Sequence, residues 1–174
     1  MPISEELKIE LTKECERIEE DALFSGKGHY NAVGRWRWSH RILGLTSAVG
    51  SAVAGIAVLK QWAPGFAIGA SALATTAAVV LTTLKPSEEA DRHQRAGDRY
   101  FAIKNRARIF RCIELITLSA DEEMLIPSIK SLSADLDNTR SGAPQIPRRA
   151  YEKAKRDIEG ENLAQYRADK SPKS

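Results

Sequence analysis

Cysteine and histidine are scarce in this chain. Its 174 residues include only two cysteines and three histidines, namely Cys15, Cys112, His29, His40 and His93. None of them has the close histidine or cysteine spacing of a zinc site, so no metal site is predicted. The two cysteines fall in helices expected to be cytoplasmic, where reducing conditions disfavour disulfides, and we expect both to be packed thiols.

The sequence also lacks a catalytic signature. The segment Gly26-Lys27-Gly28-His29 resembles a phosphate loop only superficially, because the full G-x-x-x-x-G-K-[ST] pattern and its preceding strand are absent. No other combination of residues resembles a catalytic site, so no catalytic residue, no cofactor and no enzyme activity is predicted. A small enzyme is the least favoured alternative, with its best candidate residues around Arg92, Tyr100 and Arg106.

Charge is nearly absent from one long stretch. Between Arg41 and Lys85 the only charged residue is Lys60, which separates the apolar runs 42–59 and 66–84. As helices these runs would be roughly 27 and 28 Å long, close to the ~30 Å hydrocarbon core of a bilayer. The sequence therefore predicts an all-α membrane protein with a two-span transmembrane helical hairpin. The alternative is an alanine-rich helical hairpin buried in a soluble bundle.

Basic residues at the two ends of the hairpin predict its orientation. Four precede the first span and four follow the second, namely Lys27, Arg35, Arg37, Arg41, Lys85, Arg92, Arg95 and Arg99. By the positive-inside rule both termini are cytoplasmic. The formal net charge of +3 is too small to indicate nucleic-acid binding. Anionic lipid headgroups explain the basic residues better, so the expected partner is the lipid bilayer.

Apolar residues recur at helical spacing on both sides of the hairpin. They fall at Leu11, Cys15, Ile18, Ala22 and Ser25 before it, at Ala96, Tyr100, Ile103, Ala107 and Phe110 after it, and at Leu125, Ile129, Leu132 and Leu136 farther on. Such four-three stripes predict that the membrane helices continue into the cytoplasm as packed helices with long extensions.

Charge agrees with this packing. The acidic block 14–21 and the basic block 104–111 would meet if both helices run without a break. The alternative is two independently solvated charged faces. Gly26 and Gly28 weaken the expectation of continuity and could mark a bend, because each disfavours a helix interior by up to about 1 kcal/mol.

Turn signals divide the region after the hairpin. Residues 85–86 are expected to break the helix, and Ser87 is a candidate N-cap for a helix that runs to about Ile116. Residues 119–122 resemble a capping box for the next helix, which Pro127 should kink or delay.

The last segments follow the same logic. Residues 141–144 are a predicted linker, and Pro147 fits the first turn of a final helix that reaches about Gly160. The expected organisation is a cytoplasmic amphipathic helix leading into the first span over 1–41, the transmembrane hairpin over 42–84, cytoplasmic helices over 85–166 and a disordered tail over 167–174.

Small and hydroxylated residues characterise the two spans. Rows at helical spacing are formed by Ser47, Ser51 and Gly55, by Gly65 and Gly69, and by Ala70, Ala74 and Ala78. Such rows favour close helix association, so a homo-oligomer is predicted. Ser71, Thr75 and Thr82 fall within about 40° of one another around a helix. They would form hydrogen bonds with another helix or with the backbone, or they would face water in the pore of a multi-copy assembly. The lack of ionisable residues within the spans argues against a proton-coupled transporter.

Motifs on both flanks of the hairpin are similar to those of the SLATT superfamily. They are residues 19–32, EEDALFSGKGHYNA; Arg35-Trp36-Arg37; Pro86-Ser87-Glu88; residues 92–97, RHQRAG; Tyr100; Asn105-Arg106-Ala107-Arg108; and residues 146–151, IPRRAY. The resemblance covers roughly residues 10–160. SLATT proteins are two-span helical proteins of bacterial conflict systems, often encoded beside nucleotide-second-messenger synthetases or nucleotide-sensing SLOG domains.

The resemblance implies a function. It implies an effector of the bacterial inner membrane that oligomerises to form a pore or perturb the membrane during anti-phage defence. A nucleotide second messenger, or a synthetase or sensor partner, would gate it. Interfacial or ligand-contacting residues would be Arg35, Arg37, Arg92, Tyr100 and Arg106, through headgroup contact, interhelical packing or phosphate capture. The alternative is a membrane-anchored scaffold that recruits a soluble partner through its cytoplasmic helical hairpin.

Overall fold

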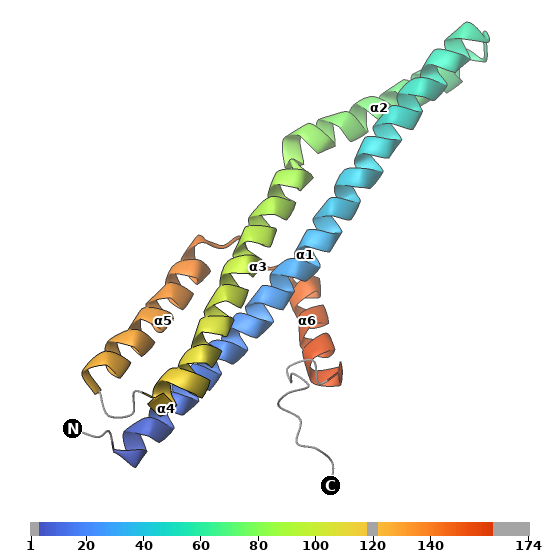
Figure 1. Cartoon of the computed structure of the whole chain (residues 1–174). Helices are drawn as coiled ribbons and strands as arrows, with labels where there is room; N and C mark the ends of the chain where they lie inside the picture. Colours follow the sequence, from blue (N-terminus) through green and yellow to red (C-terminus); the bar gives the residue numbers. More distant parts are fainter. Residues whose placement is uncertain (1–3, 118–121, 162–174) are drawn as a thin grey trace. The chain divides into compact units, whose positions relative to one another are not determined.

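The computed structural model describes residues 4–117 and 122–161, and all regular secondary structure in these residues is helical (Figure 1). The helices are α1 (Glu5–Leu59), α2 (Pro64–Leu84), α3 (Pro86–Ile109), the π-helix η1 (Phe110–Glu114), α4 (Leu115–Thr117), α5 (Glu122–Gly142) and α6 (Arg148–Glu161). An all-α chain with two long apolar helices is therefore confirmed. The predicted tail at 167–174 and residues 119–121 of the predicted capping box lie outside the described residues.

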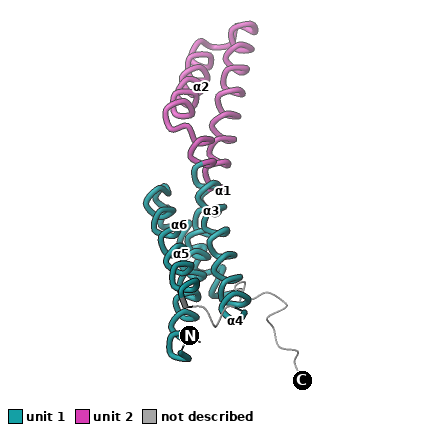
Figure 2. Tube along the Cα trace, turned by 60° about the vertical axis from the view of Figure 1, so that its left-hand side comes forward, with its two compact units in different colours: residues 1–32, 92–174 teal, residues 33–91 magenta. Residues whose placement is uncertain are grey.

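The chain divides into two compact units (Figure 2). Unit 1 comprises Met1–Ala32 and Arg92–Ser174, and unit 2 comprises Val33–Asp91. Helix α1 contributes to both units, since it continues through residues 32 and 33 without a break, and α3 begins in unit 2 and continues into unit 1. The predicted hairpin, 42–84, falls within unit 2.

Unit 1 is built on the apolar faces of α1, α3 and α5. The residues buried together are Leu11, Cys15, Ile18, Ala22, Tyr100, Ile103, Ala107, Phe110, Leu115, Leu125, Ile129, Leu132 and Leu136. All but Leu115 belong to the three stripes read from the sequence, so the predicted packing is confirmed. Helix α5 is tied to α3 by an ion pair between Arg106 and Asp135, and α6 is tied to α1 by a hydrogen bond of 3.2 Å from Asn31 Nδ2 to the carbonyl oxygen of Ala150.

Gly26 and Gly28 of α1 allow close packing rather than interrupting the helix. Helix α1 is continuous through both. A Cβ atom at Gly26 would lie 2.9 Å from Phe101 Cε2 and 3.3 Å from Tyr100 Cβ, and one at Gly28 would lie 3.1 Å from Ile146 Cγ2. The absent side chains therefore let α3 and the α5–α6 linker approach the backbone of α1.

The predicted break at residues 85–86 is confirmed, but the cap of α3 differs from the prediction. Lys85 adopts the left-handed conformation, with φ 43°, and ends α2. Helix α3 then starts at Pro86, whose fixed φ and missing N–H suit a first helical position. The Lys85 carbonyl accepts a hydrogen bond from the Glu89 N–H at 3.2 Å, so Ser87 lies inside the helix and the N-cap prediction for it is wrong.

The expected helix to about Ile116 contains a wider turn. After Phe110 the buried stripe would reach Glu114 at α-helical spacing, four residues on, whereas η1 places Leu115 in the core instead. A π-helical turn adds about one residue per turn, which keeps the carboxylate out of the core. Cys112 lies in this turn and is exposed, so the prediction of a packed thiol is correct for Cys15 and wrong for Cys112.

Two prolines test the predictions for the last two helices. Pro127 is inside α5, which begins at Glu122, so the alternative that it delays the helix start is wrong, and a kink stays a prediction. Pro147 lies directly before α6, and its carbonyl accepts hydrogen bonds from the N–H groups of Ala150 and Tyr151 at 2.8 and 3.1 Å.

Unit 2 pairs the second half of α1 with α2 through very small residues. A Cβ atom at Gly50 would lie 3.0 Å from both the carbonyl oxygen of Ala70 and the Cβ of Ala74, so this glycine marks the crossing of the two helices. Ala57 and Ala77 are also buried. Most larger apolar side chains face outward, and only 11% of the most apolar stretch of each helix is buried.

Candidate functional site

Hydroxyl-bearing residues of α1 and α2 lie on one groove of unit 2. The groove has a volume of about 490 Å³ and is lined by Ser47, Ser51, Ala54, Ser71, Ala74, Thr75, Ala78, Val79 and Thr82. Three of the rows read separately from the sequence thus contribute to one surface: the serines of the first span, the hydroxyl stripe of the second, and Ala74 with Ala78.

The hydroxyl groups in this groove fall into two classes. Ser51 and Thr82 donate hydrogen bonds to carbonyl oxygens one turn earlier in their own helices, at Ser47 and Ala78, with distances of 2.9 and 3.0 Å. No hydrogen bond joins Ser71 or Thr75 to another described residue, and both side chains are exposed. These two hydroxyls can therefore bind water or a neighbouring chain.

The predicted glycine rows lie on open surfaces. A Cβ atom at Gly55, Gly65 or Gly69 would meet no atom within 4 Å. Gly65 and Gly69 line an apolar hollow of about 570 Å³ with Val53, Ala63, Phe66 and Ala70. The close contact within the hairpin uses Gly50 instead, which the sequence reading did not single out. Packing through the other glycines between copies of the chain stays a prediction.

Two histidines meet in the interior of unit 1. His29 of α1 and His93 of α3 are both buried, and their Nδ1 atoms lie 2.8 Å apart. Only one of these nitrogens can donate while the other accepts, so a single proton lies in the contact between the two rings. Desolvation, and secondarily the charge of His93, lowers the pKa of His29 from 6.5 to about 4. Tyr100 stacks on His29 with ring centroids 5.5 Å apart.

The sequence reading missed this pair, although a signal was present. The buried stripe of α1 ends at Ser25 in the prediction, and one further four-residue step reaches His29. One three-residue step back from Ala96 reaches His93. Both histidines therefore continue the core stripes, but their mutual distance depends on the register between α1 and α3.

Ion pairs join the acidic and basic blocks. Arg111 forms a two-pronged contact with Glu19, with Nε to Oε1 at 2.7 Å and Nη2 to Oε2 at 3.3 Å. This hydrogen bond raises the pKa of Arg111. Arg140 of α5 reaches Asp21 at 3.1 Å. The predicted meeting of the two blocks is confirmed at Glu19 and Arg111, against the alternative of separately solvated faces.

The five candidate interfacial or ligand-contacting residues have different surroundings. Arg35 and Arg37 are exposed residues of unit 2. In unit 1, Tyr100 is buried in the core, where desolvation raises its pKa, and Arg106 is paired with Asp135. Arg92 lines a pocket of unit 1. The three residues of unit 1 therefore do not form one site.

The described residues hold no group of three or more histidine, cysteine, aspartate or glutamate side chains that could bind a metal ion. The candidate functional features in residues 4–117 and 122–161 are thus the hydroxyl groove, the histidine pair and the pocket at Arg92. Comparison with protein-family models, curated proteins and solved structures gave no match for this chain.

Proposed function

We propose that the chain is a membrane effector of a bacterial anti-phage or conflict system. In this proposal unit 2 inserts into the inner membrane with both termini in the cytoplasm, and several copies assemble through it to form a pore or perturb the bilayer. A nucleotide-derived signal or a partner protein acts on the cytoplasmic helices. The resemblance to the SLATT superfamily supports a role in bacterial defence, and the apolar surface of unit 2 supports its insertion into a membrane.

The observation that carries the proposal is the unburied apolar surface of unit 2. The most apolar windows of its two helices have mean hydropathies of 2.0 and 1.7, yet 11% of each window is buried. Leu59, Phe66 and Ile68 are 82%, 65% and 68% exposed. Soluble monomers rarely expose large contiguous apolar patches, and a hairpin in the core of a soluble bundle would be covered. Lipid, or other copies in lipid, would cover this surface.

The hydroxyl groove supports an assembly of several copies. Two helices enclose no lumen, so a pore needs further copies of the hairpin. Ser71 and Thr75 are exposed on one face of α2, and hydroxyls without charged rings suit a pore of broad tolerance rather than a selective filter. The open glycine faces at Gly55 and Gly69 offer surfaces where neighbouring helices could approach closely.

Dye release from liposomes tests the proposal. Full-length protein is reconstituted over a range of protein-to-lipid ratios into phosphatidylethanolamine–phosphatidylglycerol vesicles loaded with carboxyfluorescein, with and without cyclic oligonucleotides. We expect release that rises steeply with protein density. Ser71→Leu with Thr75→Leu should reduce it, because both changes remove hydroxyls from the groove. Thr76→Leu with Thr83→Leu is the matched control, since both residues are exposed on α2 and neither lines the groove. Absence of leakage under every condition would contradict a pore.

A membrane-anchored scaffold is the second candidate, favoured by exposed apolar side chains on α3, η1 and α5 of unit 1. Ile109, Ile113 and Met124 are 43%, 55% and 55% exposed there. A soluble partner could cover these side chains. In a scaffold the Ser71→Leu, Thr75→Leu variant should keep full activity in a phage-protection assay, whereas Ile113→Ser should abolish it.

A further inference from the structure

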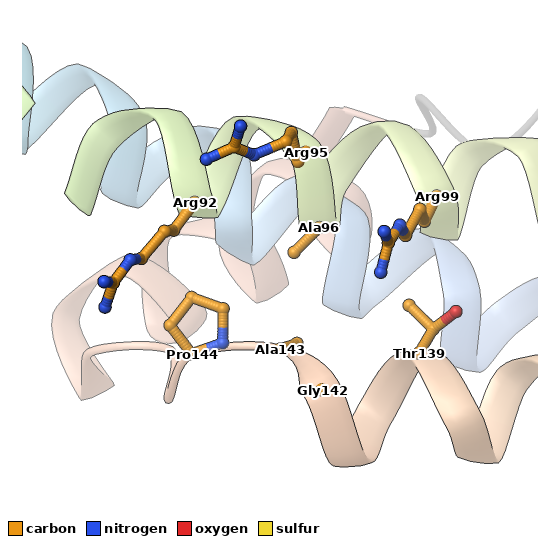
Figure 3. A pocket seen from close by; sticks show the side chains of 8 residues that line it. All are labelled: Arg92, Arg95, Ala96, Arg99, Thr139, Gly142, Ala143 and Pro144. Atoms are coloured by element: carbon orange, nitrogen blue, oxygen red, sulfur yellow. The ribbon is translucent and has the colours of Figure 1, made fainter. Parts of the chain in front are cut away.

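We infer that a pocket between α3 and the end of α5 in unit 1 binds a phosphate group. The pocket has a volume of about 370 Å³ and is lined by Arg92, Arg95, Ala96, Arg99, Thr139, Gly142, Ala143 and Pro144 (Figure 3). Three arginines and no carboxylate line it. The volume falls within the range of small-molecule sites, which runs from about 300 to 1,000 Å³.

The charge of this pocket contrasts with the rest of unit 1. No acidic side chain lines the pocket, whereas other arginines of unit 1 pair with acids across helices, as in Arg106–Asp135 and Arg111–Glu19. Arg95 and Arg99 have no ion-pair partner among residues 4–117 and 122–161. The like charges of Arg95 and Arg99, four residues apart on α3, repel each other, and an anion in the pocket would relieve that repulsion.

The arrangement of the side chains suits a phosphate. In Figure 3, Arg92 and Arg99 extend from α3 on the two sides of Ala96, the former toward Pro144 and the latter toward Thr139. The methyl group of Ala96 leaves the space between them open. Guanidinium groups donate two parallel hydrogen bonds to phosphate oxygens, and the Thr139 hydroxyl can donate another. The other wall, Ala143 and Pro144, is apolar and would contact the organic part of the ligand.

Occupancy of this pocket would reach α1 through contacts already present. The linker that forms one wall continues to Ile146, which lies against Gly28 of α1. Just beyond it, the carbonyl of Ala150 accepts the hydrogen bond from Asn31. A ligand that draws the linker toward α3 would therefore change the packing of α6 and the linker on α1. The assignment of a signalling role to the pocket rests on the proposed function, whereas phosphate binding itself does not.

The phosphate could belong to a soluble compound or to a lipid headgroup, and two probes distinguish them. Full-length protein in a neutral detergent is titrated calorimetrically with inorganic pyrophosphate. In parallel it is titrated with dihexanoyl phosphatidylglycerol below its critical micelle concentration, against dihexanoyl phosphatidylcholine as the zwitterionic reference. Binding of pyrophosphate alone assigns a soluble phosphate, and binding of phosphatidylglycerol alone assigns a headgroup. Either result supports phosphate binding in the pocket, provided that the arginine variants described next lose binding as expected.

The variants locate the binding. Arg92→Gln with Arg99→Gln should weaken it by about a hundredfold, roughly tenfold for each charged hydrogen-bonding partner. Arg149→Gln with Arg156→Gln is the matched control, because these arginines have the same seven-residue spacing on α6, are exposed and lie outside the pocket. The control should change affinity less than twofold. Arg92→Lys with Arg99→Lys, which keeps the charge but loses the planar fork, should give an intermediate loss. Circular dichroism checks that each variant is folded.

Three outcomes would overturn the inference: no binding of either probe by the wild type, equal losses in the two glutamine pairs, or full binding by folded Arg92→Gln, Arg99→Gln protein. The titration does not depend on leakage, so it separates this inference from the proposed function. Normal binding without dye release contradicts the pore and keeps the site. Dye release that persists in the glutamine variant contradicts a signalling role for the pocket.

Discussion

His29 and His93 face each other across the buried seam between α1 and α3, with their Nδ1 atoms 2.8 Å apart. This contact holds a single proton, because two Nδ1–H donors would point at each other, so both rings cannot be imidazolium ions at the same time. Tyr100 of α3 stacks on the His29 ring of α1. One helical turn after His93, Gly97 of α3 lies against Tyr30 of α1. The pair therefore links the protonation of one ring to the packing of α1 on α3.

The first prediction concerns the pH dependence of unit 1. The pKa of His29 is lowered from 6.5 to about 4, so the unfolded chain binds more protons than the folded chain between these values. The contribution of His29 to stability should be constant above about pH 7 and fall as pH drops from about 6.5 to 4, by up to about 1.4 kcal/mol per pH unit. Thermal unfolding of the detergent-solubilised protein, followed by circular dichroism, measures this slope.

Asparagine variants isolate the histidine contribution to this profile. His29→Asn keeps a hydrogen-bonding group near the Nδ1 position but does not titrate, so it should flatten the profile above the range where carboxylates titrate. His40→Asn is the control, since His40 is exposed in unit 2 and should leave the slope unchanged. Equal slopes in all three proteins would show that His29 has the same pKa in the folded and unfolded chain, which would contradict the lowered pKa.

The second prediction compares two glycines of α1. Gly26→Ala places a Cβ 2.9 Å from Phe101 Cε2, and that ring is held by stacking on Tyr30 at 5.3 Å between centroids. We expect a loss of about 1–3 kcal/mol in the free energy of unfolding. Gly34→Ala meets no atom within 4 Å and should instead stabilise the helix by about 0.5–1 kcal/mol. The midpoint of thermal unfolding should shift down for Gly26→Ala and up for Gly34→Ala relative to the wild type. Stabilisation by both substitutions would contradict close packing at Gly26.

The third prediction concerns assembly of copies. Gly69→Leu fills a surface on which a Cβ touches nothing in the single chain, so it should leave the hairpin intact while blocking close approach by a neighbour. We expect a shift from oligomer to smaller species, measured as the mass of the detergent-solubilised particle. Gly44→Leu is the control, because Gly44 is equally open and lies outside the predicted rows. Unchanged mass for the Gly69 variant would remove this face from the interface.

The fourth prediction distinguishes the two thiols. Cys112 is exposed in the π-helical turn, whereas Cys15 is buried and its pKa is raised to about 12, first by burial and then by Glu19. Because the thiolate is the reactive form, a maleimide should add once to the native protein and twice after denaturation. Intact mass gives the number of additions. Cys112→Ser should show none in the native state, and native labelling of that variant would contradict burial of Cys15.

The core of unit 1 was predictable because it follows from local spacing. Residues such as Ile18 and Ile103 repeat every three or four positions, and burial of one face is the stable arrangement for such helices. The switch from Glu114 to Leu115 was not predictable in this way, since the π-helical turn is chosen by the core that surrounds it. The same holds for the left-handed Lys85, whose conformation depends on where α2 ends and α3 begins.

The candidate sites likewise differ in whether one helix or two distant segments form them. The hydroxyl stripe of Ser71 and Thr75 could be read from one helix, because all its members lie on that helix. The crossing at Gly50, the meeting of His29 with His93 and the arginine pocket each need two segments far apart in the chain. Their formation depends on the register between helices, which residue spacing within one helix does not determine.

The continuity of α1 has a consequence for the backbone that the two units share. A single α-helix from Glu5 to Leu59 contains core residues of unit 1 and groove residues of unit 2. Cys15 and Ser47 therefore belong to one uninterrupted ladder of backbone hydrogen bonds. A proline placed between them would remove one of these bonds and break an element that both units need.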